Sequence, residues 1–173
     1  FCDHDDYVRA VKFSELAEPT LFASAGDDEI VHVKEVRPAG AERMSTRAAI
    51  ELLPKGGVRL SGEGCGWIMS LAFVRRDRYI VTGSRDGKVC LFGVGKALPV
   101  KPLKTFDIGE YEINSMAYCP LTMTLAMTSG SSDGAESGID VWSVRDTPRD
   151  TPARVSLQIA GARAVTPASE PPL

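Results

Sequence analysis

Residues 64–94 read GCGWIMSLAFVRRDRYIVTGSRDGKVCLFGV, and this stretch carries the main prediction of the fold. An alternating segment runs from Ile68 to Phe73, and a short apolar run follows at residues 79–81. The sequence RDGK at residues 85–88 contains the Asp-Gly pair that favours a tight turn, and a second alternating run comes after it. Because alternation buries one face of a strand, this stretch predicts short antiparallel strands joined by hairpin turns.

Two other segments repeat this pattern, at residues 4–36 and 109–144. In each unit the first alternating stretch ends in an aromatic residue, which is Phe13, Phe73 or Tyr118. No segment shows a sustained helical period. The sequence therefore predicts an all-β fold of repeated four-stranded antiparallel units. The fourth strands are expected at Ala49–Leu53, Leu103–Phe106 and Arg154–Ile159.

The repeated units resemble blades of the WD-repeat (WD40) β-propeller family over about residues 3–160. The family motif combines a histidine before the first strand, Ser or Thr on the second, Asp in the next turn and Trp ending the third. The resemblance implies a side-chain hydrogen-bond network that stabilises each blade. No unit carries the whole motif, so each is expected to keep only part of that network. The matching residues are His4, Ser24 and Asp28, then Thr82 and Asp86, then Asp133 and Trp142.

The repeat also predicts how the chain is divided. We expect blades at residues 1–54, with a loop insertion, at 55–106 and at 107–160, followed by a tail or linker at 161–173. WD-type propellers close with about four to eight blades, and an open arc of three would expose sheet edges and core. The chain also starts at Phe1 rather than Met. We therefore expect a fragment, whose remaining blades come from the parent chain or a partner chain.

The resemblance further implies a face that binds peptides, formed by the segments before each first strand and the turns after each second strand. Trp and Arg, which occur on this face, are frequent binding hot spots. For Trp67, packing between neighbouring blades is an equally good interpretation. We predict a non-catalytic scaffold for protein–protein interaction. The candidate partner-binding residues are Tyr7, Asp27, Trp67, Arg85, Tyr111 and Glu112.

Catalytic and cofactor sites are not expected. The sequence has no nucleophile elbow, phosphate-binding loop, zinc-protease helix or dinucleotide fingerprint. His4 has Asp neighbours that suit a general base, but the repeat register assigns it a structural role. His32 alternates with Val31 and Val33 and is expected on the other side of that strand. Two histidines and four widely spaced cysteines predict no metal site and no cofactor.

The formal net charge of −3 argues against binding nucleic acid through bulk electrostatics, although basic residues gather at Arg75–Arg78. There is no apolar run long enough for a membrane span. Scattered cysteines favour reduced thiols and an intracellular protein, cytoplasmic or nuclear. Two alternatives stay open. One is a substrate receptor of a cullin-type ubiquitin ligase, and the other is a subunit of an RNA-processing or other nucleic-acid-associated complex.

Overall fold

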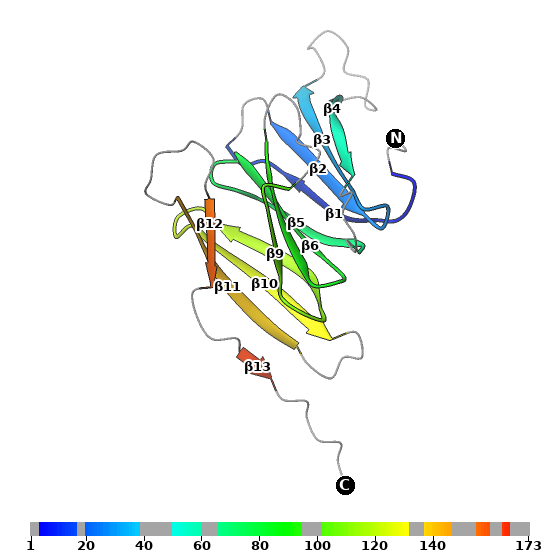
Figure 1. Ribbon diagram of the computed structural model, residues 1–173. Coiled ribbons are helices and arrows are strands. Elements are labelled where there is room, and N and C mark those ends of the chain that lie inside the picture. The colour runs from blue at the N-terminus through cyan, green and yellow to red at the C-terminus, as the bar shows by residue number, and fades with distance from the viewer. Residues whose placement is uncertain are drawn as a thin grey trace.

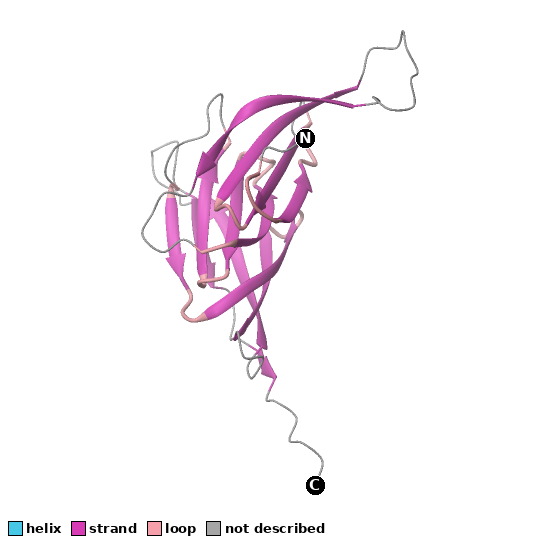
Figure 2. Ribbon diagram, turned by 90° about the vertical axis from the view of Figure 1, so that its right-hand side faces the viewer, coloured by secondary structure: helices cyan, strands magenta, loops and turns pink. Residues whose placement is uncertain are grey.

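The computed structural model describes residues 4–16, 20–38, 50–59, 66–94, 102–131, 137–146, 155–159 and 164–166. Within these ranges the regular secondary structure consists of β-strands alone, as Figure 2 shows. The all-β prediction is therefore confirmed. Among the same residues there is no helix with the length and apolar character needed to cross a membrane.

The strands form three antiparallel sheets that follow one another along the chain (Figure 1). The first sheet contains β1 (Val8–Phe13), β2 (Leu21–Gly26), β3 (Ile30–Pro38) and β4 (Ile50–Arg59), in that order. The second contains β5 (Ile68–Val74), β6 (Tyr79–Ser84), β7 (Lys88–Gly93) and β8 (Lys104–Asp107). The third contains β9 (Tyr111–Cys119), β10 (Thr124–Ser131), β11 (Ser137–Asp146) and β12 (Val155–Ile159), and β13 (Ala164–Thr166) also pairs with β11.

These strands extend past two of the expected boundaries. The fourth strand of the first sheet, β4, continues to Arg59, beyond residue 54. The short strand β13 lies in the segment expected to be a tail, where Gly138 pairs with Val165. The loop insertion is expected at residues 37–48; Arg37 and Pro38 belong to β3, and residues 39–48 lie outside the described residues. The division into three units and a tail stays a prediction.

The three sheets share one irregularity at the same place in their first hairpin. The pairing register shifts between Val8 and Ala10 in the first sheet and between Ile68 and Ser70 in the second. In the third, Ser115 pairs with Thr128 and Ile113 with Ser129, so Asn114 is skipped. Each first strand therefore carries one extra residue, a β-bulge, at an equivalent position. The extra residues are Arg9, Met69 and Asn114.

The second sheet lies between the other two and is buried on both faces. On β6, Ile80 packs into a core with Val33 of the first sheet. The next residue, Val81, packs into a separate core with Leu125 and Trp142 of the third sheet. Successive residues of a strand point to opposite faces, so this sheet supplies one side of each core.

The outer faces of the first and third sheets are open, and the sheets do not close into a ring. Val11 and Phe13 on β1 are each more than half exposed. Ile139 and Val141 on β11 are 53% and 38% exposed. Within the described residues no further sheet covers these side chains. The structure is an open arc of three sheets, each with the strand order of a propeller blade.

Candidate partner-binding site

The segment before β1 is tied to the β2–β3 turn by His4. The Nδ1 atom of His4 lies 2.8 Å from Asp28 Oδ2, and its Nε2 lies 2.8 Å from Ser24 Oγ. Since a carboxylate only accepts, Nδ1–H donates to Asp28, and in the neutral imidazole Nε2 accepts from the Ser24 hydroxyl. Asp28 also accepts the backbone N–H groups of Asp5 at 3.2 Å and Ile30 at 3.1 Å. The structure thus brings together the three residues predicted for this network, and their stabilising role stays a prediction.

His32 lies close to this network. It is on β3, and it is partly buried on the side away from the buried residues Val31 and Val33. Its ring meets the His4 ring edge-on, with centroids 4.6 Å apart and planes at 85°. Partial burial, and then the nearby His4, lower the pKa of His32 below its ordinary value of 6.5. Both effects favour the uncharged imidazole of His32.

In the second sheet, the carboxylate in the equivalent turn contacts side chains of its own hairpin. Asp86 accepts a hydrogen bond from the Ser84 hydroxyl and forms an ion pair with Lys88, whose Nζ lies 3.0 Å from Asp86 Oδ2. Burial opposes ionisation, but these contacts and a hydrogen bond from the Gly66 backbone outweigh it and lower the pKa of Asp86 below 3.8. Thr82 is buried on β6, and Ser84, rather than Thr82, provides the hydroxyl partner. Ser84 ends β6 two residues before Asp86, which places its hydroxyl within reach.

In the third sheet Trp142 is a core residue. It is 2% exposed and opposes Leu125, and its ring meets Phe106 edge-on with centroids 5.2 Å apart. Its Nε1 atom has no hydrogen-bond partner within the described residues. The position equivalent to Ser24 is here Met127, two residues beyond Leu125 on β10, and a thioether is a poor acceptor. Asp133, the other residue predicted for this unit, lies outside the described residues.

A second group of side chains connects all three sheets, and we call it the Trp67 cluster. It consists of Tyr7, Arg9, Asp27, Trp67, Arg85 and Glu112. Trp67 lies just before β5, and the Cζ atoms of Arg85 and Arg9 are 4.6 Å and 5.6 Å from the centroid of its ring. Both distances fall within the range of a cation–π contact. Arg9 also lies 5.4 Å from the Tyr7 ring centroid.

Each arginine of the Trp67 cluster is held by a carboxylate. Arg9 donates from Nε and Nη2 to the two oxygens of Asp27, at 2.8 Å and 2.5 Å. This two-point contact fixes the plane of the guanidinium, and only 2% of the Asp27 side chain is exposed. Arg85 Nε donates to Glu112 Oε1 at 2.8 Å, which joins the second sheet to the third. The arginines are therefore positioned before any partner binds.

The backbone places these side chains in the same way in the first two sheets. The N–H of Asp27 donates to the carbonyl of Tyr7 at 2.9 Å, and the N–H of Arg85 donates to the carbonyl of Trp67 at 2.8 Å. Tyr7 and Trp67 therefore occupy equivalent positions, as do Asp27 and Arg85. Arg9 is the bulge residue of β1, and a bulge redirects a side chain from the regular alternation.

Five of the six predicted binding residues lie in the Trp67 cluster. The sixth, Tyr111, is next to Glu112 at the start of β9, and its backbone carbonyl lies near Gly87. Sequence reasoning missed Arg9, because the alternating pattern does not show a bulge. A signal was nevertheless present in the alignment of the units. Tyr7 aligns with Trp67, and Arg9 lies only two residues after Tyr7, so it belongs to the same segment of the first unit. The structure also answers the question about Trp67: the residue contacts a neighbouring sheet and is still 39% exposed.

The basic stretch Arg75–Arg78 forms the turn between β5 and β6, at the strand ends opposite the Trp67 cluster. Arg75 Nη1 contacts Met123 Sδ at 3.2 Å. Asp77 is buried and accepts the backbone N–H of Leu16 at 2.5 Å. This turn therefore contacts the segment after β1 on one side and the turn between β9 and β10 on the other, whereas the side chain of Arg76 within it is exposed.

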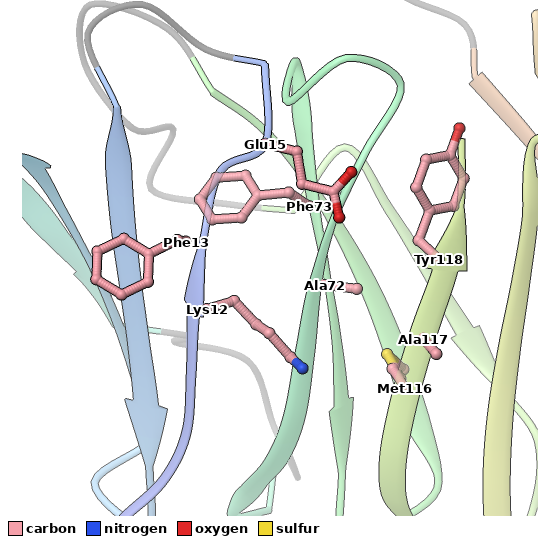
Figure 3. A pocket seen from close by; sticks show the side chains of 8 residues that line it. All are labelled: Lys12, Phe13, Glu15, Ala72, Phe73, Met116, Ala117 and Tyr118. Carbon is pink, nitrogen blue, oxygen red and sulfur yellow. The ribbon is translucent and has the colours of Figure 1, made fainter. Parts of the chain in front are cut away.

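At this same end, a hollow of about 220 Å³ lies where the first strands of the three sheets come together. Figure 3 shows Lys12 and Glu15 directed toward the space beside β5, with Tyr118 across it on β9. Phe73 and Met116 form part of its apolar wall. The hollow is small and has side chains of both charges. Its lining residues do not include an aromatic ring flanked by two arginines, which is the feature that distinguishes the Trp67 cluster.

The comparison with known proteins bears on the second sheet. Residues 57–92 match the family model WD40, described as "WD domain, G-beta repeat". No curated protein matches the chain. WD40 repeats are generally non-catalytic interaction domains, and WD40 domains typically bind other proteins. The WD40 match at residues 57–92 and the three antiparallel, unclosed sheets of the chain together fit a partial WD40 propeller.

Proposed function

We propose that this chain is a non-catalytic scaffold within a multiprotein complex and that it binds proteins or peptides through the Trp67 cluster. The observation that carries the proposal is the Trp67 ring, which arginines from two sheets contact while 39% of the residue stays exposed. A half-exposed aromatic held by fixed charges is a typical anchor for a protein partner.

The Trp67 cluster offers a partner apolar surface and charge in one place. Tyr7 is 73% exposed beside it, and 47% of the Arg85 side chain is exposed. The ion pair of Arg85 with Glu112 uses Nε, and a guanidinium has four further N–H donors. Carboxylates or backbone carbonyls of a partner can accept from them. The partner chemistry that fits is an apolar side chain flanked by acceptor groups.

The fold also keeps the cost of binding low. The backbone of the Trp67 cluster is held by strand pairing, and its arginine side chains are held by Asp27 and Glu112. Side chains that are ordered beforehand lose less conformational entropy when a partner binds. The acidic members of the cluster add selectivity, because they repel a partner that places negative charge beside them.

We further propose that the remaining propeller blades come from the parent chain or from a partner chain. The support is the exposed apolar residues on both outer faces, at Val11 and Phe13 on one side and at Ile139 and Val141 on the other. Neighbouring blades in this structure bury equivalent faces against one another. Blades on either side would cover these residues in the same way.

The test of the binding face compares two variants in an affinity pull-down analysed by mass spectrometry. The double variant Trp67→Ala with Arg85→Glu removes the ring and reverses the charge. We expect it to lose at least one endogenous partner, with Tm lowered by only a few degrees, because an exposed ion pair contributes about 0–1 kcal/mol. The matched control is Arg76→Glu, which makes the same charge change in the turn at the opposite strand ends.

The control should retain that partner. If Arg76→Glu loses the partner and the double variant keeps it, the partner binds at the strand ends that carry Arg76, and the assignment of the binding face to the Trp67 cluster is wrong. RNA crosslinking in cells tests the other class of function. A crosslink to RNA that survives denaturation of protein–protein contacts would contradict the scaffold and favour a nucleic-acid-associated subunit.

A further inference from the structure

We propose that His4, Asp28 and His32 form a binding site for a divalent transition metal ion of the zinc type. Each residue offers one ligand atom, and the three atoms lie within 4.8 Å of one another. Tetrahedral zinc with ligand bonds of about 2.0–2.1 Å places its donor atoms roughly 3.3 Å apart. Closing the remaining gap requires the two imidazole rings to rotate. This inference is independent of the Trp67 cluster and of the proposed scaffold function.

His32 supplies the observation that the WD-repeat network leaves unexplained. Its Nε2 atom is buried and has no hydrogen-bond partner in the described part of the chain. A buried polar atom without a partner destabilises the fold, and a metal ion bonded to its lone pair would remove that penalty. His32 opposes Ser24 in the β2–β3 pairing, and the residue that opposes Thr82 in the second sheet is Cys90. The imidazole at this position is therefore not part of the repeat.

His4 and Ser24 already have the arrangement found around a metal-bound histidine. A ligating imidazole usually makes a second hydrogen bond through its other nitrogen, which fixes the ring. In His4, Nδ1 lies beside Asp28 Oδ2 and Nε2 lies 2.8 Å from Ser24 Oγ. When the metal binds at Nδ1, the ring proton moves to Nε2 and the hydrogen bond to Ser24 reverses direction. Asp28 keeps its charge and turns its oxygen from the imidazole N–H to the metal.

The kind of metal follows from the ligand atoms. Two imidazole nitrogens and one carboxylate oxygen suit zinc and neighbouring transition metals, whereas Mg²⁺ and Ca²⁺ prefer sites made of oxygen ligands. Three protein ligands leave a fourth position of a tetrahedral ion for water or another group. The ion would connect the segment before β1 to the turn after β2 and to β3 itself. It would therefore hold the first sheet at three points.

The experiment uses the full chain after treatment with a chelator, and it titrates Zn²⁺ by calorimetry. We expect one zinc ion per chain, and Tm raised by about 5–10 °C when free zinc is roughly 100 times Kd. Mg²⁺ at the same concentration should leave Tm unchanged. Co²⁺ in place of zinc should give the intense visible absorption of a tetrahedral site.

The decisive variant is His32→Gln, because it removes one ligand and leaves the hydrogen bonds of His4 intact. Removing a residue that only hydrogen-bonds to a metal ligand weakens metal binding by about 10–100-fold. Because His32→Gln removes a ligand itself, it should weaken zinc binding by at least roughly 100-fold. Its Tm without metal should stay near that of the wild type. The control is Cys119→Ser, which removes the exposed thiol. The proposal is overturned if the wild type binds no zinc, if His32→Gln binds as tightly as the wild type, or if Cys119→Ser loses binding.

Discussion

The packing of the second sheet against the third can be tested at Gly83 on β6. A Cβ atom built on this glycine would lie 2.7 Å from Met116 Cε and 2.8 Å from Ile113 Cβ, and Ile113 Cγ2 would be closer still. Both neighbours belong to β9 of the third sheet and are buried. Gly83→Ala therefore forces the two sheets apart or pushes side chains from their preferred rotamers.

The size of the effect follows from these contacts. Overpacking a filled core costs about 1–3 kcal/mol. The end of the Met116 side chain can move, but the β-branched Ile113 cannot turn away, so we expect the upper half of that range. For a chain of 173 residues, 1 kcal/mol shifts Tm by about 2–4 °C, so Gly83→Ala should lower Tm by roughly 4–12 °C.

The matched control is Gly93→Ala, at the end of β7 in the same sheet. There the new Cβ would meet only Leu103 Cδ1 at 3.5 Å, which is ordinary contact. Without strain, replacing Gly by Ala leaves stability unchanged or raises it by about 0.4–1 kcal/mol, because the unfolded chain loses freedom. Urea denaturation and calorimetry of both variants give the comparison.

A double variant separates the clash from any general effect of the substitution. Ile113→Ala removes Cγ2 and costs stability by itself. Combined with Gly83→Ala, it should cost less than the sum of the two single changes by about 0.5–3 kcal/mol, because the closest clash, with Ile113 Cγ2, is then absent and only the approaches to Cβ and to Met116 Cε remain. If Gly83→Ala is no more destabilising than Gly93→Ala, or if the two changes are additive, the second and third sheets do not pack at Gly83 as described.

Two further predictions concern ionisable groups. Asp86→Ala should lower the free energy of unfolding at pH 7 by about 1–2 kcal/mol, the lower part of the cost of unsatisfied hydrogen bonds, because 29% of the side chain is exposed. The pKa of Asp86 is lowered below 3.8, so this stabilisation is present above that pH and disappears as the pH falls through the folded pKa. Urea titrations from pH 7 to pH 2 should therefore show the free energies of unfolding of the wild type and Asp86→Ala converging at low pH. The Thr122 hydroxyl, with nearby backbone N–H groups, lowers the pKa of exposed Cys119 below 9.0, so iodoacetamide should alkylate Cys119 before buried Cys90. Thr122→Val should slow alkylation of Cys119 as measured by mass spectrometry, and equal rates for both proteins would contradict this account.

The fold was predictable because its signals are local and repeated. Alternation in residues 68–73 and the Asp-Gly turn at 86–87 each specify a hairpin without information from distant parts of the chain. Comparing three units then predicted four strands in each sheet, and the structure adds β13 to the third sheet. The grouping of Tyr7, Trp67 and Arg85 could be inferred by aligning the units.

The rest depended on contacts that sequence spacing does not contain. Arg9 of the first sheet contacts Trp67 of the second, and Arg9 is the bulge residue of β1, which the alternating pattern does not reveal. Ser84, rather than Thr82, bonds Asp86, since the choice depends on where β6 ends. His4 and His32 are 28 positions apart in the sequence, yet their rings are in contact. This contact results from the strand order, in which β2 lies between β1 and β3. No local pattern in the sequence encodes these distances.

The bulge shared by the three first strands has a consequence for how such a surface can diversify. A residue in a regular strand either fills the core or faces outward, and changing its type disturbs one of the two layers. The bulge residues Arg9, Met69 and Asn114 are exempt from that constraint, and they are a cation, a thioether and an amide. Mutation of Met69 or Asn114 can therefore alter charge and shape while the cores stay as they are, whereas Arg9 also pairs with the buried carboxylate of Asp27. Binding preference and folding stability can be selected separately at Met69 and Asn114.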